Sequence, residues 1–171
     1  MSQLILADKS DLLRRSISSV LSREGYEVVT AETGNRVLSL VQTMKPAAII
    51  LDLETPDPSG LETLLLLKRD PATRRVPVVL VSRDSTPSAV SNAFKVGAEG
   101  FMLKPIDLNQ LLKTLNGLQI PIPQLNSPIT LSVTGRVNAR TTGSLRFIDQ
   151  YGTIYLDKSA NKDDPAAKIW N

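Results

Sequence analysis

Apolar positions along the first two-thirds of the chain follow two alternating patterns. Short, largely apolar runs predict buried strands at 4–7, 26–30, 47–51, 76–81 and 100–103. Between and after these runs, apolar residues recur every three or four positions, which predicts five helices beginning near Asp11, Thr33, Gly60, Ser88 and Asp107, with Asp11 and Asp107 as N-caps. Because strands and helices alternate, the pattern predicts an α/β fold whose parallel sheet is covered on both faces.

Four polar residues stand at the carboxyl ends of predicted strands. These are Asp8, Asp52, Ser82 and Lys104. Each alone is compatible with an ordinary polar strand end, but in such a sheet ligands bind beyond these ends, so the four together predict a site. An aspartate can accept a phosphoryl group, an ammonium and a hydroxyl can hold its oxygens, and carboxylates can ligate magnesium.

The same segments resemble the receiver domain of bacterial two-component response regulators (CheY-like). The resemblance rests on Leu-Ile-Leu-Ala-Asp at 4–8, on the segment 51–60 with its Pro and Gly, on Val-Ser at 81–82, and on 97–105 with its Lys-Pro. It covers residues 3–118. It implies a doubly wound, flavodoxin-like, five-stranded parallel sheet in the order 2-1-3-4-5.

The resemblance also implies roles for individual residues. Asp52 would be the phosphoacceptor, assisted by Lys104 and Ser82, and Ser82 and Phe101 would form the conformational switch. Asp8, Asp52 and the backbone carbonyl of Glu54 would bind Mg²⁺. A sensor histidine kinase or a phosphotransfer protein would supply the phosphoryl group. A downstream protein would bind the fourth helix, fifth strand and fifth helix, and a homodimer is a further option.

Three residues depart from the family pattern. Lys9 stands at the second acid position, Arg83 follows the switch serine, and Glu54 places a carboxylate at the rim of the site. An ammonium cannot ligate a metal, so we expect Lys9 to weaken magnesium binding and to pair with Asp8 or Asp52. Two alternatives are that Lys9 points into solvent, and that a one-residue shift in register makes Asp8 the direct ligand.

The last fifty residues have a different pattern. Residues 120–128 contain repeated prolines and predict a stiff linker between the domain 1–119 and a small β extension at 129–160. Runs at 129–133, 145–148 and 153–156 predict a hairpin or three strands, which need a packing partner because so small a β unit is marginal alone. Residues 161–171 form a polar tail.

Composition narrows the classes of function. The chain of 171 residues has no histidine and no cysteine, which argues against triad hydrolysis and zinc chemistry. The net charge of +3 is spread along the chain and argues against nucleic acid as the main partner. The N-terminus has no basic leader and no long apolar run, which predicts a cytoplasmic protein without a membrane span.

The sequence therefore predicts a signalling protein that accepts a phosphoryl group on Asp52 and switches a protein-binding surface. It would not be an enzyme beyond phosphorylating itself from a donor and slowly losing the phosphoryl group. The alternative is a pseudo-receiver, a protein-binding or dimerisation module that is never phosphorylated; Lys9, Glu54 and Arg83 favour it. A lesser alternative is a nucleic-acid-binding regulator that works through the β extension, for which steep salt dependence of binding would be the sign.

Overall fold

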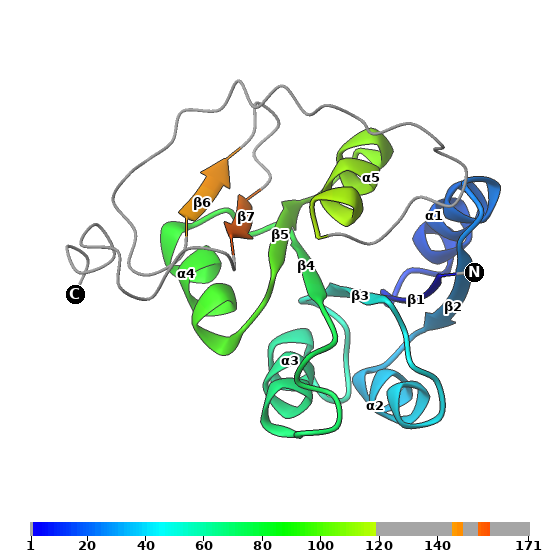
Figure 1. Ribbon diagram of the computed structural model, residues 1–171, viewed down its shortest axis with the longest axis horizontal. Helices are drawn as coiled ribbons and strands as arrows, with labels where there is room; N and C mark the ends of the chain where they lie inside the picture. The colour runs from blue at the N-terminus through cyan, green and yellow to red at the C-terminus, as the bar shows by residue number, and fades with distance from the viewer. Residues whose placement is uncertain (1, 119–144, 149–153, 158–171) are drawn as a thin grey trace.

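The computed structural model describes residues 2–118, 145–148 and 154–157 of the chain. Five parallel strands form the centre of the sheet, in the order β2-β1-β3-β4-β5 that the resemblance implied (Figure 1). Their bounds are Gln3–Ala7 (β1), Glu27–Ala31 (β2), Ala48–Asp52 (β3), Val78–Ser82 (β4) and Gly100–Leu103 (β5). All residues of β3 and β4 are buried, as expected for inner strands covered on both faces.

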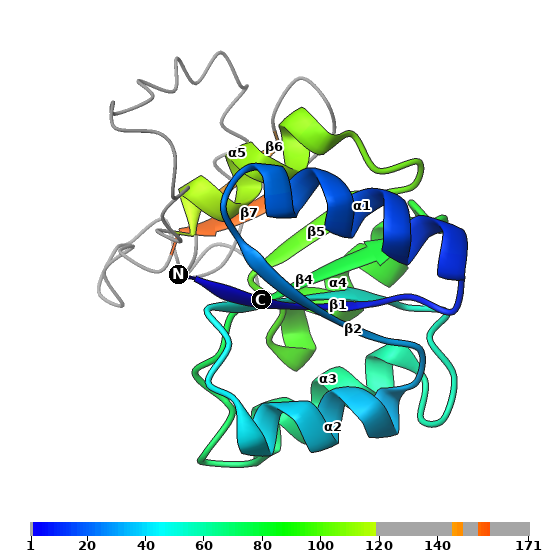
Figure 2. The ribbon, with the colours of Figure 1, turned by 90° about the vertical axis from the view of Figure 1, so that its right-hand side faces the viewer.

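Helices cover both faces of this sheet. In the described part of the chain they are Asp11–Arg23 (α1), Gly34–Thr43 (α2), Gly60–Arg69 (α3), Pro87–Val96 (α4) and Leu108–Gly117 (α5). Figure 2 shows α1 and α5 on one face and α2 and α3 on the other. Buried side chains of α4 belong to the same apolar cluster as those of α2 and α3, so α4 covers that second face. The α/β prediction is thus confirmed for the parallel sheet and its helices.

The caps explain where the helices begin, and they correct one expectation. Thr33, Ser59 and Asp107 each accept a backbone N–H of the first turn, and Ser59 also forms a capping box with Glu62. The expected cap at Asp11 is wrong, because the hydroxyl of Ser10 accepts the N–H of Leu13 and Asp11 is already helical. An acidic residue in the first turn is also favourable for the helix dipole, so the two positions look alike in sequence.

Two further strands lie in the C-terminal third, at Leu145–Ile148 (β6) and Ile154–Asp157 (β7). They pair antiparallel with each other, and β7 pairs antiparallel with β5 at Gly100 and Phe101. The predicted linker 120–128, the predicted strand 129–133 and the polar tail 161–171 lie outside the described residues.

A buried ion pair ties α3 to the segment between α4 and β5. The ammonium of Lys68 lies 2.9 Å and 3.0 Å from the two carboxylate oxygens of Glu99 and donates to the carbonyl of Val76 at 2.8 Å. Glu99 also accepts the N–H of Val78 at 2.7 Å. The two side chains are 10% and 5% exposed, so both charges are satisfied inside the protein rather than by water.

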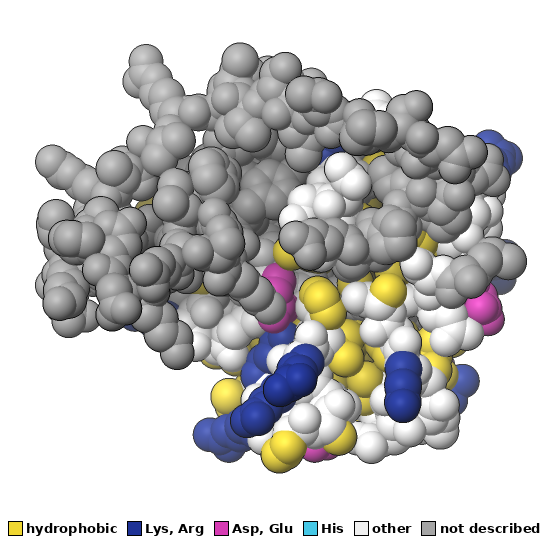
Figure 3. Space-filling model, in the orientation of Figure 1, with side chains coloured by type: hydrophobic (Ala, Val, Ile, Leu, Met, Phe, Trp, Pro, Cys, Tyr) yellow, Lys and Arg dark blue, Asp and Glu magenta, His cyan; other side chains and the backbone are white. Residues whose placement is uncertain are grey.

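The surface shown in Figure 3 is mixed. Lysine and arginine side chains gather over α3 beside apolar ones. Arg69, at the end of α3, and Arg74 and Arg75, in the segment that follows it, are exposed. Leu66, on α3, is also partly exposed, at 44%. No helix among the described residues has the length and apolar character needed to cross a membrane.

The buried ion pair generates the first prediction. Lys68→Met should destabilise the protein by about 3–5 kcal/mol, because Glu99 would keep a buried charge without its partner. Lys95→Met, which removes an exposed lysine of α4, should change stability by less than about 0.5 kcal/mol. Urea unfolding followed by circular dichroism measures both. Equal free energies of unfolding for the two variants would show that the ion pair does not contribute to stability.

Tyr26 generates a prediction about alkaline pH. Burial, with a smaller effect of Glu24, raises its pKa from 10.0 to about 12, and its hydroxyl has no hydrogen-bond partner. The unfolded chain therefore loses this proton first, and stability should fall as the pH rises from about 10 through about 12. In Tyr26→Phe this loss should be smaller, and stability at neutral pH should be unchanged or higher by up to about 1 kcal/mol. Thermal melts of both proteins across this range test it; parallel curves would contradict it.

Candidate functional site

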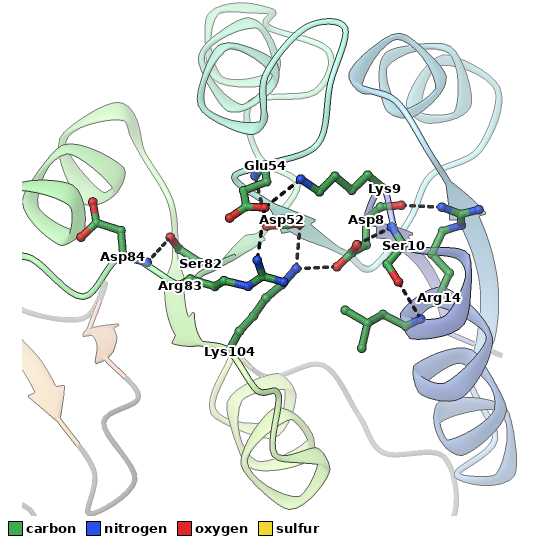
Figure 4. Close-up of polar contacts among 11 residues, drawn as sticks. Asp8, Lys9, Ser10, Arg14, Asp52, Glu54, Ser82, Arg83, Asp84 and Lys104 are labelled. Carbon is green, nitrogen blue, oxygen red and sulfur yellow. Dashed lines mark hydrogen bonds and ion pairs between the residues drawn. The ribbon is translucent and has the colours of Figure 1, made fainter.

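Three charged side chains meet at the carboxyl edge of the sheet and form what we call the acid cluster. Asp8 follows β1, Asp52 ends β3 and Lys104 follows β5. The ammonium of Lys104 lies 2.8 Å from Oδ2 of Asp8 and 2.8 Å from Oδ2 of Asp52, as Figure 4 shows. The three side chains are 3%, 1% and 8% exposed, in the order Asp8, Asp52 and Lys104. The convergence expected from the strand ends is therefore present for these three.

The electrostatics of the acid cluster keep Lys104 charged. Burial is the largest influence and lowers its pKa, but hydrogen bonds and charges from Asp52 and Asp8 together raise the pKa of Lys104 above its usual value. Two carboxylates and one ammonium leave the cluster with one negative charge. Lys104 thus bridges two groups that would otherwise repel each other across a buried edge.

The loop after β3 fixes Asp52. The backbone N–H of Glu54 donates to Oδ1 of Asp52 at 3.1 Å, and the N–H of Leu53 continues the ladder to Val81 at 2.9 Å. Gly60 brings the start of α3 against this loop, since a Cβ there would lie 2.3 Å from the carbonyl oxygen of Asp52. Any larger residue at position 60 would push α3 away from the strand end.

Asp8 is held by residues that sequence reasoning did not assign to the site. The backbone N–H of Ser10 donates to Oδ1 of Asp8 at 2.7 Å, and the guanidinium of Arg14 donates to the carbonyl oxygen of Asp8 at 2.6 Å. Arg14 is an α1 residue whose side chain is 12% exposed. An aspartate commonly accepts the backbone N–H two residues on, so Asp8 itself was the signal for such a turn, whereas nothing in the sequence singles out Arg14 from Arg15.

The two residues expected to act as a switch are both buried. Ser82 ends β4, is 4% exposed, and its hydroxyl oxygen accepts the N–H of Asp84 at 2.9 Å. Its carbonyl accepts the N–H of Lys104 at 2.9 Å, which places it beside the acid cluster. Phe101 is 1% exposed and belongs to the apolar cluster beneath α2, α3 and α4. Its side chain thus already lies in the core, whereas the family resemblance implies that it turns inward only in the switched state.

The three residues that depart from the family pattern form a group of exposed charges, here called the rim. Lys9 Nζ lies 2.9 Å from Oε2 of Glu54, and Arg83 Nη1 lies 3.9 Å from the same oxygen (Figure 4). The hydrogen bond and charge of Lys9, with the charge of Arg83, hold the pKa of Glu54 below its usual value. The expected pairing of Lys9 with Asp8 or Asp52 is wrong, because Lys104 already occupies the space between these carboxylates.

The donor set does not fit a dedicated magnesium site. Each of the four carboxylate oxygens of Asp8 and Asp52 already accepts a hydrogen bond, and an ammonium lies between the two groups. Magnesium in proteins usually keeps several waters and takes one or two carboxylates, but here the Lys104 ammonium, 2.8 Å from an oxygen of each carboxylate, competes with the ion for the same ligands. Among the described residues there is no group of three or more acidic, histidine or cysteine side chains that could hold a metal ion.

The acid cluster has the chemistry of a nucleophile with a charged partner. A carboxylate such as Asp52 can attack phosphorus, and an ammonium within hydrogen-bond distance can neutralise developing negative charge on phosphoryl oxygens. The Ser82 hydroxyl beside them is a donor that can rotate toward a new acceptor. The rim carries two further cations close to this edge.

Comparison with known proteins identifies the family. A model of the response regulator receiver domain matches residues 4–116. Protein PilH of Pseudomonas aeruginosa is 26% identical over 118 residues, covering 69% of this chain and 98% of PilH. The sensory/regulatory protein RpfC of Xanthomonas campestris pv. campestris is 32% identical over 130 residues, which cover 75% of this chain but 18% of RpfC. The chain thus spans about a fifth of that relative's length.

A solved structure agrees with this result. The chemotaxis protein CheY4 of Vibrio cholerae matches with a TM-score of 0.66 and 29% sequence identity, over 69% of this chain and 98% of that protein. The chain therefore belongs to the response regulator receiver domain family, and it is a signalling module of two-component systems rather than a catalytic enzyme.

Proposed function

We propose that the chain accepts a phosphoryl group on Asp52 from a histidine kinase or a phosphotransfer protein, and then changes a protein-binding surface on α4, β5 and α5. The observation that carries this proposal is the ammonium of Lys104, 2.8 Å from both Asp52 and Asp8 at the carboxyl edge of the sheet. It holds the carboxylate of Asp52 in place, and it remains within reach of the phosphoryl oxygens.

In this mechanism one carboxylate oxygen of Asp52 attacks phosphorus and the bond to the donor breaks. Lys104 moves from its position between the two carboxylates toward the new phosphoryl oxygens, and its hydrogen bond to Asp8 weakens. The hydroxyl of Ser82 gives up the hydrogen bond that it accepts from the N–H of Asp84 and donates one to a phosphoryl oxygen instead. This change moves the β4–α4 connection. Phe101 is already inward, so the surface change is carried by Ser82 and the start of α4 rather than by the aromatic ring.

One observation favours the alternative of a pseudo-receiver. The carboxylate of Glu54 stands at the rim, where it repels an incoming phosphate donor, and it is paired with the one residue that replaces a metal-binding acid, Lys9. In a pseudo-receiver the same fold would bind its partner without phosphorylation. The nucleic-acid alternative rests on the C-terminal third, and no described contact supports it.

Asp52→Asn decides between the two main functions. The wild type should gain one phosphoryl group from acetyl phosphate, labile in base, and Asp52→Asn should fall to background because an amide is not a nucleophile for this transfer. Asp57→Asn is the matched control, since Asp57 is an exposed acid of the same loop whose φ of 51° asparagine tolerates. Intact-protein mass spectrometry measures the label.

The outcomes separate the proposals. Label that persists in Asp52→Asn would remove Asp52 as the acceptor. A wild type that takes up no label from any donor, yet still binds a partner, would make the chain a pseudo-receiver. For a phosphorylated protein we expect amide shift changes to spread from the strand-end site into α4, β5 and α5.

We also propose that residues 1–119 form the receiver unit, followed by a linker at 120–128, a β extension at 129–160 and a polar tail. Both buried apolar clusters that can be described consist of residues between 4 and 118. A chain ending at Leu118 should therefore unfold cooperatively, with a melting temperature within about 5 °C of the full chain. A broad, non-cooperative melt of the shortened chain would show that the remaining residues complete the core.

A further inference from the structure

The rim places two cations and one anion directly above the reactive side chains. Each rim residue follows a strand-end residue closely in sequence: Lys9 comes after Asp8, Glu54 two residues after Asp52, and Arg83 after Ser82. The same register that brings the strand ends together therefore brings the rim together. Lys9 and Arg83 approach the same oxygen of Glu54, at 2.9 Å and 3.9 Å.

Charge at the site becomes unbalanced when a phosphoryl group arrives. The acid cluster carries one net negative charge, and an aspartyl phosphate brings two in place of the carboxylate's one. Lys104 is already shared between two carboxylates, so it cannot neutralise this charge alone. The donor set does not fit a metal, and the remaining positive charge at this edge of the described protein that is not engaged with Asp8 comes from Lys9 and Arg83.

We propose that Lys9 and Arg83 bind the phosphoryl group in place of a metal ion, and that Glu54 is the anion that holds them until the phosphoryl group displaces it. This inference rests on the proposed phosphorylation of Asp52. The geometry supports an exchange, because the rim side chains are exposed: Lys9 at 56%, Glu54 at 36% and Arg83 at 68%. Water can replace each partner as the ion pair opens, so no charge is left buried and unpaired during the exchange.

The step balances without a metal or any further reactant. A carboxylate oxygen of Asp52 attacks the phosphorus of acetyl phosphate, the bond from phosphorus to the acetyl oxygen breaks, and acetate leaves with the electron pair. The Glu54 carboxylate turns into solvent, and its two cations pair with the phosphoryl oxygens. In the later hydrolysis water attacks phosphorus, the bond from phosphorus to the Asp52 oxygen breaks, and the Asp52 carboxylate leaves with the electron pair. Inorganic phosphate carries the water's oxygen away, its proton passes to solvent, and Glu54 pairs again with Lys9.

Phosphorylation rates from acetyl phosphate test the proposal. In wild type the rate should change less than about 3-fold on adding EDTA, because Lys9 and Arg83 supply the positive charge that a bound ion otherwise would. Glu54→Gln should raise the rate about 10-fold, with the gain lost at high salt, since it removes a charge that repels the donor and frees two that attract it. Lys9→Gln should lower it about 10-fold, and Lys9→Asp should make it depend on magnesium.

A double-mutant cycle distinguishes an exchange from simple repulsion. If Glu54 acts by holding the two cations, then Glu54→Gln should give a much smaller gain in a Lys9→Gln, Arg83→Gln background. Glu32→Gln is the matched control, because it removes an exposed acid whose ion pair, at 4.0 Å, is with Arg14 and not with Lys9 or Arg83. Thermal melts of all variants should match wild type, since the rim is exposed.

The results that overturn the inference differ from those that overturn the proposed function. Wild-type labelling that EDTA abolishes and magnesium restores would remove the metal-free role of Lys9 and Arg83, and an unchanged rate in Glu54→Gln would remove the role of Glu54. If no protein labels, the proposed function fails, but calorimetry with inorganic phosphate still tests the rim. Glu54→Gln should then bind phosphate about 10-fold more tightly than wild type and Glu32→Gln; equal affinities would overturn the inference.

Discussion

The ammonium of Lys104 is the interaction on which the strand-end site depends. Two carboxylates from different strands lie at a buried edge, where like charges repel strongly and unpaired charges are costly. Lys104 reaches both at 2.8 Å from a third strand, so β1, β3 and β5 are joined at one point by a single cation. Without that cation two like charges would face each other at a buried edge, which is costly.

The acid cluster is buried and the rim is exposed. This difference explains how the usual fold of the family can carry an unusual set of charges at its site. Inside, each oxygen of Asp8 and Asp52 has a fixed donor, so geometry decides the partners. Outside, Lys9 and Glu54 are exchangeable with water, so their pairing adds little to stability and can respond to an arriving ligand. Substitutions at the rim can therefore retune the charge of the site while the sheet beneath stays the same.

Much of this fold could be predicted from the sequence because its signals are local and periodic. Apolar runs marked the five parallel strands, and Asp107 marked the start of the last helix through its capping side chain. The strand ends predicted Asp8, Asp52, Ser82 and Lys104 as neighbours, since parallel strands share one carboxyl edge. The expected roles of these residues in phosphorylation stay predictions.

Side-chain partners were harder to predict, because they depend on reach and competition in three dimensions. The sequence placed Lys9 between Asp8 and Asp52, but Lys104 fills that space and Lys9 extends to Glu54 instead. The first helix starts after Ser10 rather than at an Asp11 cap because both residues suit a helix start, and only the backbone geometry selects one. Arg14 was missed because its contact is with a carbonyl oxygen, which leaves no mark in the sequence.

The buried pair of Lys68 and Glu99 has a mechanical consequence for α4. Gly97, which ends α4 with a φ of 120°, lies against the stem of Lys68, and Glu99 two residues later is clamped by its ammonium. The C-terminal end of α4 is therefore pinned to α3, whereas residues 83–88 at its other end are exposed and directly follow Ser82. We therefore expect a displacement that begins at the strand-end site to be largest in the first turn of α4. It should diminish toward Gly97, where the helix is held against α3.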